Sequence, residues 1–211
     1  MKILWLNEVD STQTYLLEAL KSNDLKVPIA VVAKRQNCGK GSRENEWIGL
    51  DGNLFVSFAI SKSSLPNDLR LESTSIYLSM ILKELLFQLG SKAWLKWPND
   101  FYIDNKKVGG TITNVYKNCI VCGIGLNIKV APQGSSVLDI NVEIGKLLNQ
   151  YFNFVKSCQS WKQIFSKFEL EFDKSRKYFT HIENEKVSLV NVTLQDDGSI
   201  EYDGKKVYSL R

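Results

Sequence analysis

The sequence predicts an α+β fold, in which a mixed, largely antiparallel sheet packs against helices and a small β module follows at the C-terminus. Apolar runs separated by tight polar turns occupy residues 93–128, as in an antiparallel meander. Apolar residues at helical spacing occupy residues 69–89, and short strand-like runs with Asp-Gly turns begin at Val187. We therefore expect one main domain over residues 1–182 and the β module over residues 183–211.

The first third of the chain predicts a strand, a helix and two further strands. Residues 2–9 form the first strand, and Asp10-Ser11-Thr12 supplies capping groups for the helix that follows. Short apolar runs at residues 29–33 and 54–60 predict two more strands. The polar, glycine-bearing stretch from Gln36 to Asn53 lies between them, and loops of that length in compact domains are usually functional or disordered.

A longer helix is expected over residues 69–89, where apolar side chains recur at helical spacing. Asn67 or Asp68 can cap its start, and Gly90 supplies its stop. The apolar face of this helix is assigned to the core, with no functional role.

Three β segments and two helices complete the main domain. The β segments are expected at residues 93–103, 107–116 and 119–128, and the helices near residues 139–151 and 158–179.

Composition excludes several classes of protein. A chain of 211 residues can bury a core without disulfides, and its four cysteines lack the spacing of a disulfide framework. The 27 basic and 23 acidic residues give a net charge of +4 that is spread along the chain, which gives little support for nucleic-acid binding. No signal-peptide core opens the chain and no apolar stretch is long enough to cross a bilayer, so we expect a cytoplasmic protein with no membrane or DNA partner.

Cys119 and Cys122 form a C-x-x-C pattern, which suggests redox or metal chemistry as one hypothesis. The surrounding run predicts a strand, on which residues three apart point to opposite faces, so we expect buried free thiols instead. His181 is the one histidine, and it cannot supply a histidine-rich metal site or an obvious catalytic triad.

The segment from Gln36 to Arg43, followed by Trp47, combines glycines, two cations, a hydroxyl group and an aromatic ring. Glycines let backbone N–H groups approach an anion, cations neutralise phosphate charge, and an indole offers a stacking face for a nucleobase. The G-x-x-x-x-G-K-[ST] spacing of the phosphate loop of NTPases is absent. A solvated basic surface loop is the structural alternative.

The segment from Lys96 to Asp100 interrupts an apolar run with a cation, a proline and two polar residues. A carboxylate at such a strand-end turn suits Mg²⁺, which takes one or two protein carboxylates beside substrate phosphates. A plain turn capped by Asn99 and Asp100 is the alternative.

Two glycine-bearing segments fall on predicted strands. Lys107 precedes Gly109 and Gly110 at the start of a strand, where a backbone would come close to a ligand; an ordinary β-bulge with a solvated lysine is the alternative. Gly123 to Asn127 alternates glycines with branched apolar residues, so one face lacks side chains and admits either a flat ligand edge or a packed helix.

Taken in order, these segments resemble the catalytic domain of bacterial biotin protein ligases, specifically over roughly the first 130 residues and loosely thereafter. The matching segments are Asp10-Ser11-Thr12, Gln36, Gly39-Lys40-Gly41 with Trp47, Lys96 to Asp100, Lys107 to Gly110, and Gly123 to Asn127. The resemblance implies a class II synthetase-like catalytic domain that binds biotin and ATP, followed by an SH3-like C-terminal module.

The resemblance also implies an activity and the residues that carry it. The enzyme would use ATP and Mg²⁺ to activate biotin as biotinyl-AMP, and would transfer biotin to a lysine of the biotin carboxyl carrier protein of acetyl-CoA carboxylase. The implied biotin-binding residues are Ser11, Thr12, Gln13, Gln36, Gly39, Lys40, Lys107, Gly110 and Gly123. The implied ATP-binding residues are Lys40, Gly41, Ser42, Arg43, Trp47, Lys96, Asn99, Lys107 and Asn127. Catalysis would rest on Lys107, Arg43 and Lys40, and Asp100 would organise Mg²⁺.

The sequence departs from the family pattern at the substrate loop. Gln13 stands where the family usually has Asn, and Lys40, Ser42 and Asn45 stand in a loop that commonly reads G-R-G-R with a further arginine. Arg43 is the candidate to replace part of that charge. These departures bear on how the intermediate is retained.

Larger family members carry an N-terminal winged-helix domain that binds an operator. The predicted catalytic strand begins at Lys2 here, so we expect no repressor activity. Two other functions stay open: a lipoate ligase or octanoyltransferase of related fold, and a non-catalytic biotin- or nucleotide-binding protein. The sequence leaves the oligomeric state open, a homodimer included.

Overall fold

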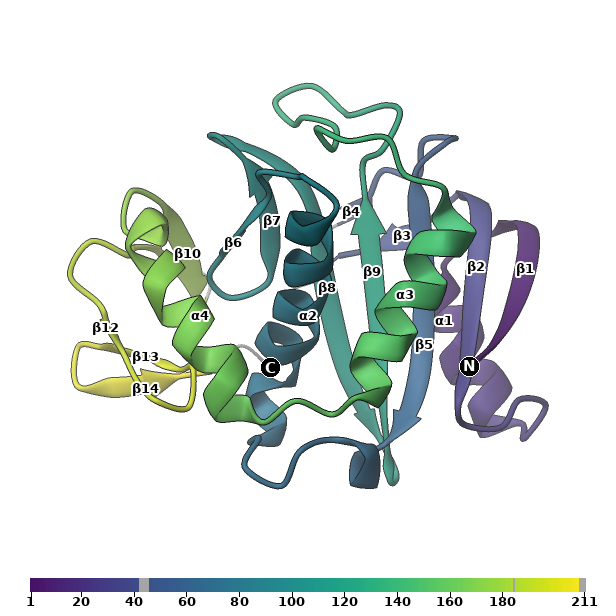
Figure 1. Cartoon of the computed structure of the whole chain (residues 1–211), viewed down its shortest axis with the longest axis horizontal. Coiled ribbons are helices and arrows are strands. Elements are labelled where there is room, and N and C mark those ends of the chain that lie inside the picture. The colour runs from purple at the N-terminus through teal and green to yellow at the C-terminus, as the bar shows by residue number, and fades with distance from the viewer. Residues whose placement is uncertain (42–45, 184, 209–211) are drawn as a thin grey trace.

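The computed structural model describes residues 1–41, 46–183 and 185–208, and its centre is a seven-stranded sheet (Figure 1). The strands lie in the order β1-β2-β5-β9-β8-β7-β6, with β1 parallel to β2 and every other neighbouring pair antiparallel. The strands are β1 (Lys2–Val9), β2 (Ile29–Gln36), β5 (Leu54–Ser61), β9 (Cys119–Leu126), β8 (Lys106–Tyr116), β7 (Asp100–Ile103) and β6 (Trp94–Lys96). The predicted mixed, largely antiparallel sheet is confirmed.

Helices cover both faces of this sheet. Along β2, Val31 packs against α1 (Thr12–Lys21) on one face, whereas Ala30 and Val32 join the larger core on the other face. That larger core is formed with α2 (Thr74–Gln88), α3 (Ile144–Lys156) and α4 (Trp161–Ser175). The alternation follows from the strand geometry, because successive side chains point to opposite faces.

The predicted cap of the long helix is wrong. Helix α2 begins at Thr74, after two short 3-10 turns at Lys62–Ser64 and Leu71–Ser73. The carboxylate of Asp68 instead accepts hydrogen bonds from the backbone N–H groups of Trp161 (2.9 Å) and Lys162 (3.1 Å), at the start of α4. The predicted stop is confirmed, since Gly90 follows α2 with a φ of +94°.

Helix α3 (Ile144–Lys156) lies five residues later than the range predicted near 139–151, and α4 (Trp161–Ser175) is shorter than the range predicted near 158–179. Helix α3 begins at Ile144 because Glu143 caps it by accepting from the N–H groups of Gly145 and Lys146. Helix α4 ends at Ser175, so the residues just beyond it are not helical as predicted but turn into a strand.

Short C-terminal strands are present, as predicted. They are β10 (Phe179–Ile182), β11 (Glu185–Ser188), β12 (Thr193–Leu194), β13 (Ile200–Tyr202) and β14 (Lys205–Val207). The expected boundary between residues 182 and 183 falls in the turn of the β10–β11 hairpin. Leu189, Val192 and Ile200 share a core with the central sheet, and the division into two domains stays a prediction.

The cysteines are free thiols, but only partly as expected. Cys122 is fully buried, and burial raises the pKa of its thiol well above the ordinary value. Cys119, on the opposite face of β9, is only half-buried. Within the described ranges there is no cluster of three or more His, Cys, Asp or Glu side chains that could hold a metal ion, and no helix long and apolar enough to span a membrane.

Candidate functional site

The predicted long loop contains a two-stranded hairpin, β3 (Gly39–Lys40) with β4 (Glu46–Trp47), that lies over the central sheet (Figure 1). Gly39 pairs with Trp47, and a Cβ atom at position 39 would lie 2.5 Å from the Trp47 carbonyl oxygen. Glycine is therefore required for the hairpin to close, and the hairpin brings Lys40 and Trp47 to the same place. Ser42 and Arg43, predicted for ATP binding, lie outside the described residues.

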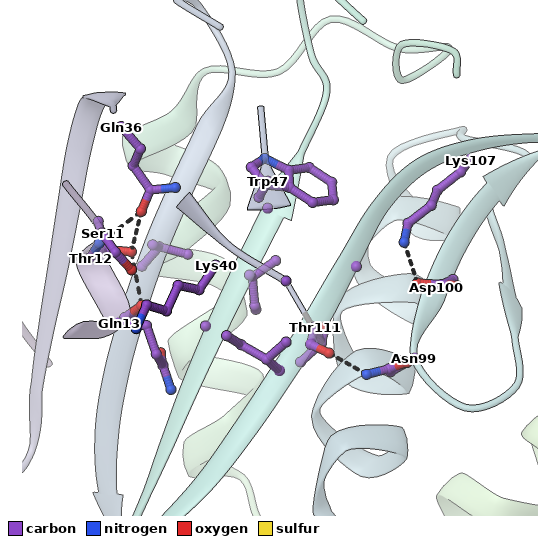
Figure 2. A pocket seen from close by; sticks show the side chains of 18 residues that line it. Ser11, Thr12, Gln13, Gln36, Lys40, Trp47, Asn99, Asp100, Lys107 and Thr111 are labelled. Atoms are coloured by element: carbon purple, nitrogen blue, oxygen red, sulfur yellow. Dashed lines mark hydrogen bonds and ion pairs between the residues drawn. The ribbon is translucent and has the colours of Figure 1, made fainter. Parts of the chain in front are cut away.

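A small cavity of about 40 Å³ lies between the hairpin, the start of α1 and the strands β5, β8 and β9 (Figure 2). Predicted site residues that line it are Ser11, Thr12, Gln13, Gln36, Lys40, Gly41, Trp47, Asn99, Asp100, Lys107, Gly110 and Gly123. This volume is far below the several hundred cubic ångströms of an ordinary small-molecule site. A ligand larger than a few water molecules must therefore displace side chains that fill the cavity.

One end of the cavity is a corner of hydroxyl and amide groups (Figure 2). The Gln36 Oε1 atom accepts from the Thr12 backbone N–H (2.7 Å) and from the Thr12 hydroxyl (3.0 Å). The Thr12 hydroxyl also lies 2.9 Å from the Ser57 hydroxyl, and Ser11 caps α1 through the Thr14 N–H. Because Gln36 Oε1 is engaged by Thr12, the orientation of the Gln36 amide is fixed with its N–H₂ group on the other side.

Three glycines, at positions 110, 123 and 125, leave the strands beneath the cavity without side chains of their own at these points. A Cβ at position 125 would lie 2.6 Å from Cε2 of Trp47, so the indole rests directly on the Gly125 backbone. A Cβ at position 123 would lie 2.7 Å from Oε1 of Gln13, and one at position 110 would lie 3.2 Å from Oδ1 of Asp100. The glycines thus let the aromatic, amide and carboxylate groups approach the sheet.

The other end of the cavity carries charge. The Lys107 ammonium lies 2.6 Å from Oδ1 of Asp100, and the Lys96 ammonium lies 3.5 Å from Oδ2. Burial disfavours the charged carboxylate, but the two ammonium groups outweigh burial and hold the pKa of Asp100 below its ordinary value. Lys107 is also 5.8 Å from the Trp47 ring centre, within range of a cation–π contact.

Three buried polar atoms of the lining have no hydrogen-bond partner among the described residues: Gln13 Oε1, Trp47 Nε1 and Thr111 Oγ1. Buried polar atoms are nearly always paired, and an unpaired one costs roughly 1–3 kcal/mol. Three such atoms around one cavity are positions that ordered water or a polar ligand can complete.

A larger cavity of about 550 Å³ adjoins the first and shares part of its wall. Both are lined by Gln13, Lys40, Gly41, Asn99, Asp100, Lys107 and Ile112. The larger one extends along the outer half of β8 to the strand β10, where Phe179 and His181 form its far wall. Asp100 and Lys107 therefore face both spaces, whereas Lys96 faces the larger one.

The structure places three predicted site residues beside the small cavity rather than on its wall. Gly39, within the hairpin, lines a third cavity instead, and Lys96 lines only the larger cavity. Asn127 is buried at the end of β9, where its N–H donates to the Val108 carbonyl (2.7 Å) and its Oδ1 has no partner among the described residues.

The sequence alone did not single out Ser57, Thr111 or Gly125, which also line the small cavity. Ser57 is a lone hydroxyl inside the apolar strand β5, and that interruption was the one signal that could have found it. Gly125 lay within a noted glycine segment, but its contact with Trp47 depends on how the hairpin folds over the sheet.

Comparison with known proteins gives one family and several solved relatives. A model of the biotin/lipoate A/B protein ligase family matches residues 5–127. The bifunctional ligase/repressor BirA of Escherichia coli is 30% identical over 138 residues, which cover 62% of this chain and 42% of that protein. The chain thus spans less than half the length of that curated relative.

Solved structures resemble the whole chain. Biotin acetyl coenzyme A carboxylase synthetase from Helicobacter pylori, crystallised with bound biotinylated ATP, is 40% identical with a TM-score of 0.93, covering 98% of this chain and 99% of that one. The biotin protein ligase from Aquifex aeolicus, in complex with biotin and ATP, is 24% identical with a TM-score of 0.75, covering 100% of this chain and 96% of that one, and supports the fold alone.

Proposed function

The chain belongs to the biotin/lipoate A/B protein ligase family, and from this premise we propose that it is an ATP-dependent biotin protein ligase. The observation that carries the proposal is a single cavity that joins an uncharged corner around Thr12 and Gln36 to a charged cluster around Lys107. Biotin has the same polarity, with an uncharged bicyclic urea at one end and a carboxylate at the other. The relative from H. pylori, with its bound biotinylated ATP, supports this choice of substrates.

The uncharged corner is proposed to hold the urea ring. Ser11, Thr12, Gln13 and Gln36 offer hydroxyl, amide and backbone groups there, and Gly110 and Gly123 leave space for the ring and its chain. Trp47 fills the space over Gly125 and must shift when the ligand enters, because the remaining volume of about 40 Å³ is too small for a bicyclic ring.

The charged end is proposed to carry out activation. An oxygen of the biotin carboxylate attacks the α-phosphorus of ATP, the bond to the bridging oxygen breaks, and pyrophosphate leaves. Two anions must approach each other in this step, so Lys107 and Lys40 stabilise it by neutralising charge and positioning the reacting groups. The ion pair with Asp100 holds the Lys107 ammonium in place before the substrates arrive. Gly41, Trp47, Lys96, Asn99 and Asn127 are proposed to surround the adenylate, and Ser42 and Arg43 remain sequence-based candidates.

Mg²⁺ is proposed to enter with ATP rather than to occupy a site of its own. Asp100 is the carboxylate in the lining, and one protein carboxylate plus substrate phosphates is an ordinary ligand set for this ion. Both Asp100 oxygens face ammonium groups, so the described residues do not form a site for a free ion. When bound, Mg²⁺ would neutralise phosphate charge beside Asp100.

Transfer is proposed to use the larger cavity. The uncharged amine of an acceptor lysine attacks the carbonyl carbon of biotinyl-AMP, and AMP leaves with the electrons of the broken C–O bond. The nitrogen releases one proton to solvent as the amide forms. The 550 Å³ space opens beside Lys107 and Asp100, and this supports it as the route by which an acceptor side chain would reach the activated carbonyl. The biotin carboxyl carrier protein of acetyl-CoA carboxylase is the proposed acceptor. The cytoplasmic location, a homodimer and the lack of repressor activity stay predictions.

Release of pyrophosphate tests the first half-reaction. The purified protein with ATP and MgCl₂ should release pyrophosphate when biotin is added, and lipoate or octanoate should not replace biotin. Equal release with octanoate would favour a lipoate ligase or octanoyltransferase. Binding of biotin without pyrophosphate release would favour a non-catalytic binding protein.

A further inference from the structure

Gln13 lies in the first turn of α1, between the two cavities. Its side chain is 4% exposed and lines the 40 Å³ cavity (Figure 2). It also lines the 550 Å³ cavity. A buried amide in such a wall must have each of its polar atoms satisfied, either by the protein or by a ligand.

The orientation of the Gln13 amide is fixed by the backbone. Its Nε2 atom donates to the Val121 carbonyl oxygen (3.3 Å) and to Oδ1 of Asn114 (2.9 Å). A carbonyl oxygen can only accept, so the nitrogen of the amide must face Val121. The oxygen of Gln13 therefore faces the cavity.

That oxygen is an acceptor without a donor. Gln13 Oε1 has no hydrogen-bond partner within the described part of the chain, and it lies 2.7 Å from the position of a Cβ on Gly123. The bare glycine leaves room for a ligand atom against it. A ligand that brings an N–H group to this point satisfies the acceptor, whereas an acyl chain without a donor leaves it buried and unpaired.

We infer that Gln13 and Asn114 form a pair that selects the ring of the substrate, in which Gln13 Oε1 accepts from a ring N–H and Asn114 is a positioning residue. The inference rests on the proposed function and adds to it the reason why a urea ring is preferred over a linear acyl chain. Asn114 touches no ligand in this scheme, because it acts by holding Nε2 of Gln13 on the side away from the cavity.

Substitution of the acceptor tests the pair. Gln13→Met keeps the length and most of the volume of the side chain but removes the oxygen, so the dissociation constant for biotin should rise about tenfold. Gln88→Met is the matched control, because Gln88 is exposed at the end of α2 and the chemical change is identical. Calorimetric titration with biotin measures both, and thermal unfolding confirms that the variants are folded.

The positioning role predicts a different pattern at position 114. Asn114→Asp keeps an oxygen that can accept from Gln13 and should bind biotin as the native protein does, whereas Asn114→Leu should raise the biotin KM and leave kcat unchanged. The ring lies away from the reacting carboxylate, so its contacts stabilise ground state and transition state alike. Loss of kcat with unchanged KM in Asn114→Leu would contradict the role.

Biotin analogues identify the N–H group directly. Two cyclic carbamate analogues of biotin each have one of the two ring N–H groups replaced by oxygen. The analogue that lacks the N–H group donated to Gln13 should bind the native protein and Gln13→Met with equal affinity, because it cannot make the hydrogen bond that the substitution removes. The inference is overturned if Gln13→Met weakens the binding of biotin and of both carbamates by the same factor. It is also overturned if the native protein binds biotin and Gln13→Met binds it equally well. If the native protein does not bind biotin, the proposed function fails first.

Discussion

The contact between Lys107 and Asp100 places a cation where the proposed reaction brings two anions together. Lys107→Ala should lower the rate of biotin-dependent pyrophosphate release by about 100- to 1,000-fold, because loss of one preorganised group costs roughly 3–4 kcal/mol of transition-state stabilisation. The steady-state rate of pyrophosphate release at saturating ATP and biotin measures this loss.

The neighbouring lysine on the same strand supplies the control for that substitution. Lys106 is exposed and is not part of either cavity lining, so Lys106→Ala should keep the native rate. Near-native pyrophosphate release by Lys107→Ala would remove Lys107 from the mechanism.

Individual site residues could be predicted where they stand in distinctive short motifs, as Thr12, Gln36 and Lys107 do. The position of Ser57 and the unpaired Gln13 oxygen could not, because both depend on which strands become neighbours in the sheet. Distances between motifs far apart in the chain are set by the tertiary fold. Residue types and motifs therefore predicted many residues of the cavity lining but not the contacts between them.

At the scale of elements, Asp68 was correctly predicted to interact with the start of a helix, but the predicted helix was the wrong one. Its carboxylate accepts from N–H groups at a helix start, but at that of α4, whose N-cap is Ser160, rather than at that of the helix that follows it in the sequence. A carboxylate can cap any helix start that the fold brings within reach, so spacing along the chain does not decide which one.

The cap predicts a specific loss of stability. Asp68→Ala should lower the free energy of unfolding by about 1–2 kcal/mol, because the Trp161 and Lys162 N–H groups lose their acceptor. The adjacent exposed residue provides the comparison, since Asn67→Ala should have little effect. Denaturation by urea measures both, and a larger loss from Asn67→Ala would restore the original assignment.

The hairpin and the sheet are linked through the contact of Trp47 with Gly125. In Gly125→Ala the added methyl group occupies the place of the indole, so Trp47 should move toward solvent and its fluorescence emission should shift to longer wavelength. In a protein that already carries Trp47→Phe, adding Gly125→Ala should leave the emission wavelength unchanged. This comparison separates the signal of Trp47 from that of the other tryptophans. An unchanged emission spectrum in Gly125→Ala would show that the indole does not rest on this glycine.

At the scale of the whole molecule, Asp197 joins the C-terminal strands to the main core. Its carboxylate accepts from the Ser199 hydroxyl (2.6 Å) and pairs with Lys206 (2.7 Å) and, more distantly, Arg70 (3.8 Å). Burial opposes the charge, but Lys206 and the hydrogen bonds from Ser199 outweigh it and lower the pKa of Asp197 to about 2. The charged form is therefore the one that the folded state favours.

The lowered pKa of Asp197 predicts how the free energy of unfolding changes with pH in acid. A carboxylate whose pKa is lower in the folded state than its ordinary 3.8 stabilises the fold above that value and loses the contribution as the pH falls toward about 2. Asp197→Asn should flatten the fall in unfolding free energy over this interval, as measured by urea denaturation at each pH. Asp203→Asn, in the exposed turn between β13 and β14, should keep the native slope; equal slopes for all three proteins would contradict the assignment.

The sheet order and the shared core explain why the overall architecture was easier to predict than its boundaries. Alternating apolar runs and tight turns identify β5, β8 and β9, and these features are local, whereas the single β segment predicted at 93–103 is wrong, because it forms two antiparallel strands, β6 and β7. The course of the chain beyond α4 depends on long-range contacts such as the hydrogen bond from Trp97 Nε1 to the Gly198 carbonyl (2.9 Å). Such contacts leave no periodic pattern in the sequence.

The most direct test of the account is the intact mass of an isolated biotin carboxyl carrier domain after incubation with the protein, ATP, MgCl₂ and biotin. The carrier should gain the mass of one biotinyl group on its acceptor lysine, and the gain should disappear without ATP or with Lys107→Ala. An unmodified carrier in the complete reaction, or a carrier that gains an octanoyl or lipoyl group from the corresponding acid instead, would contradict it.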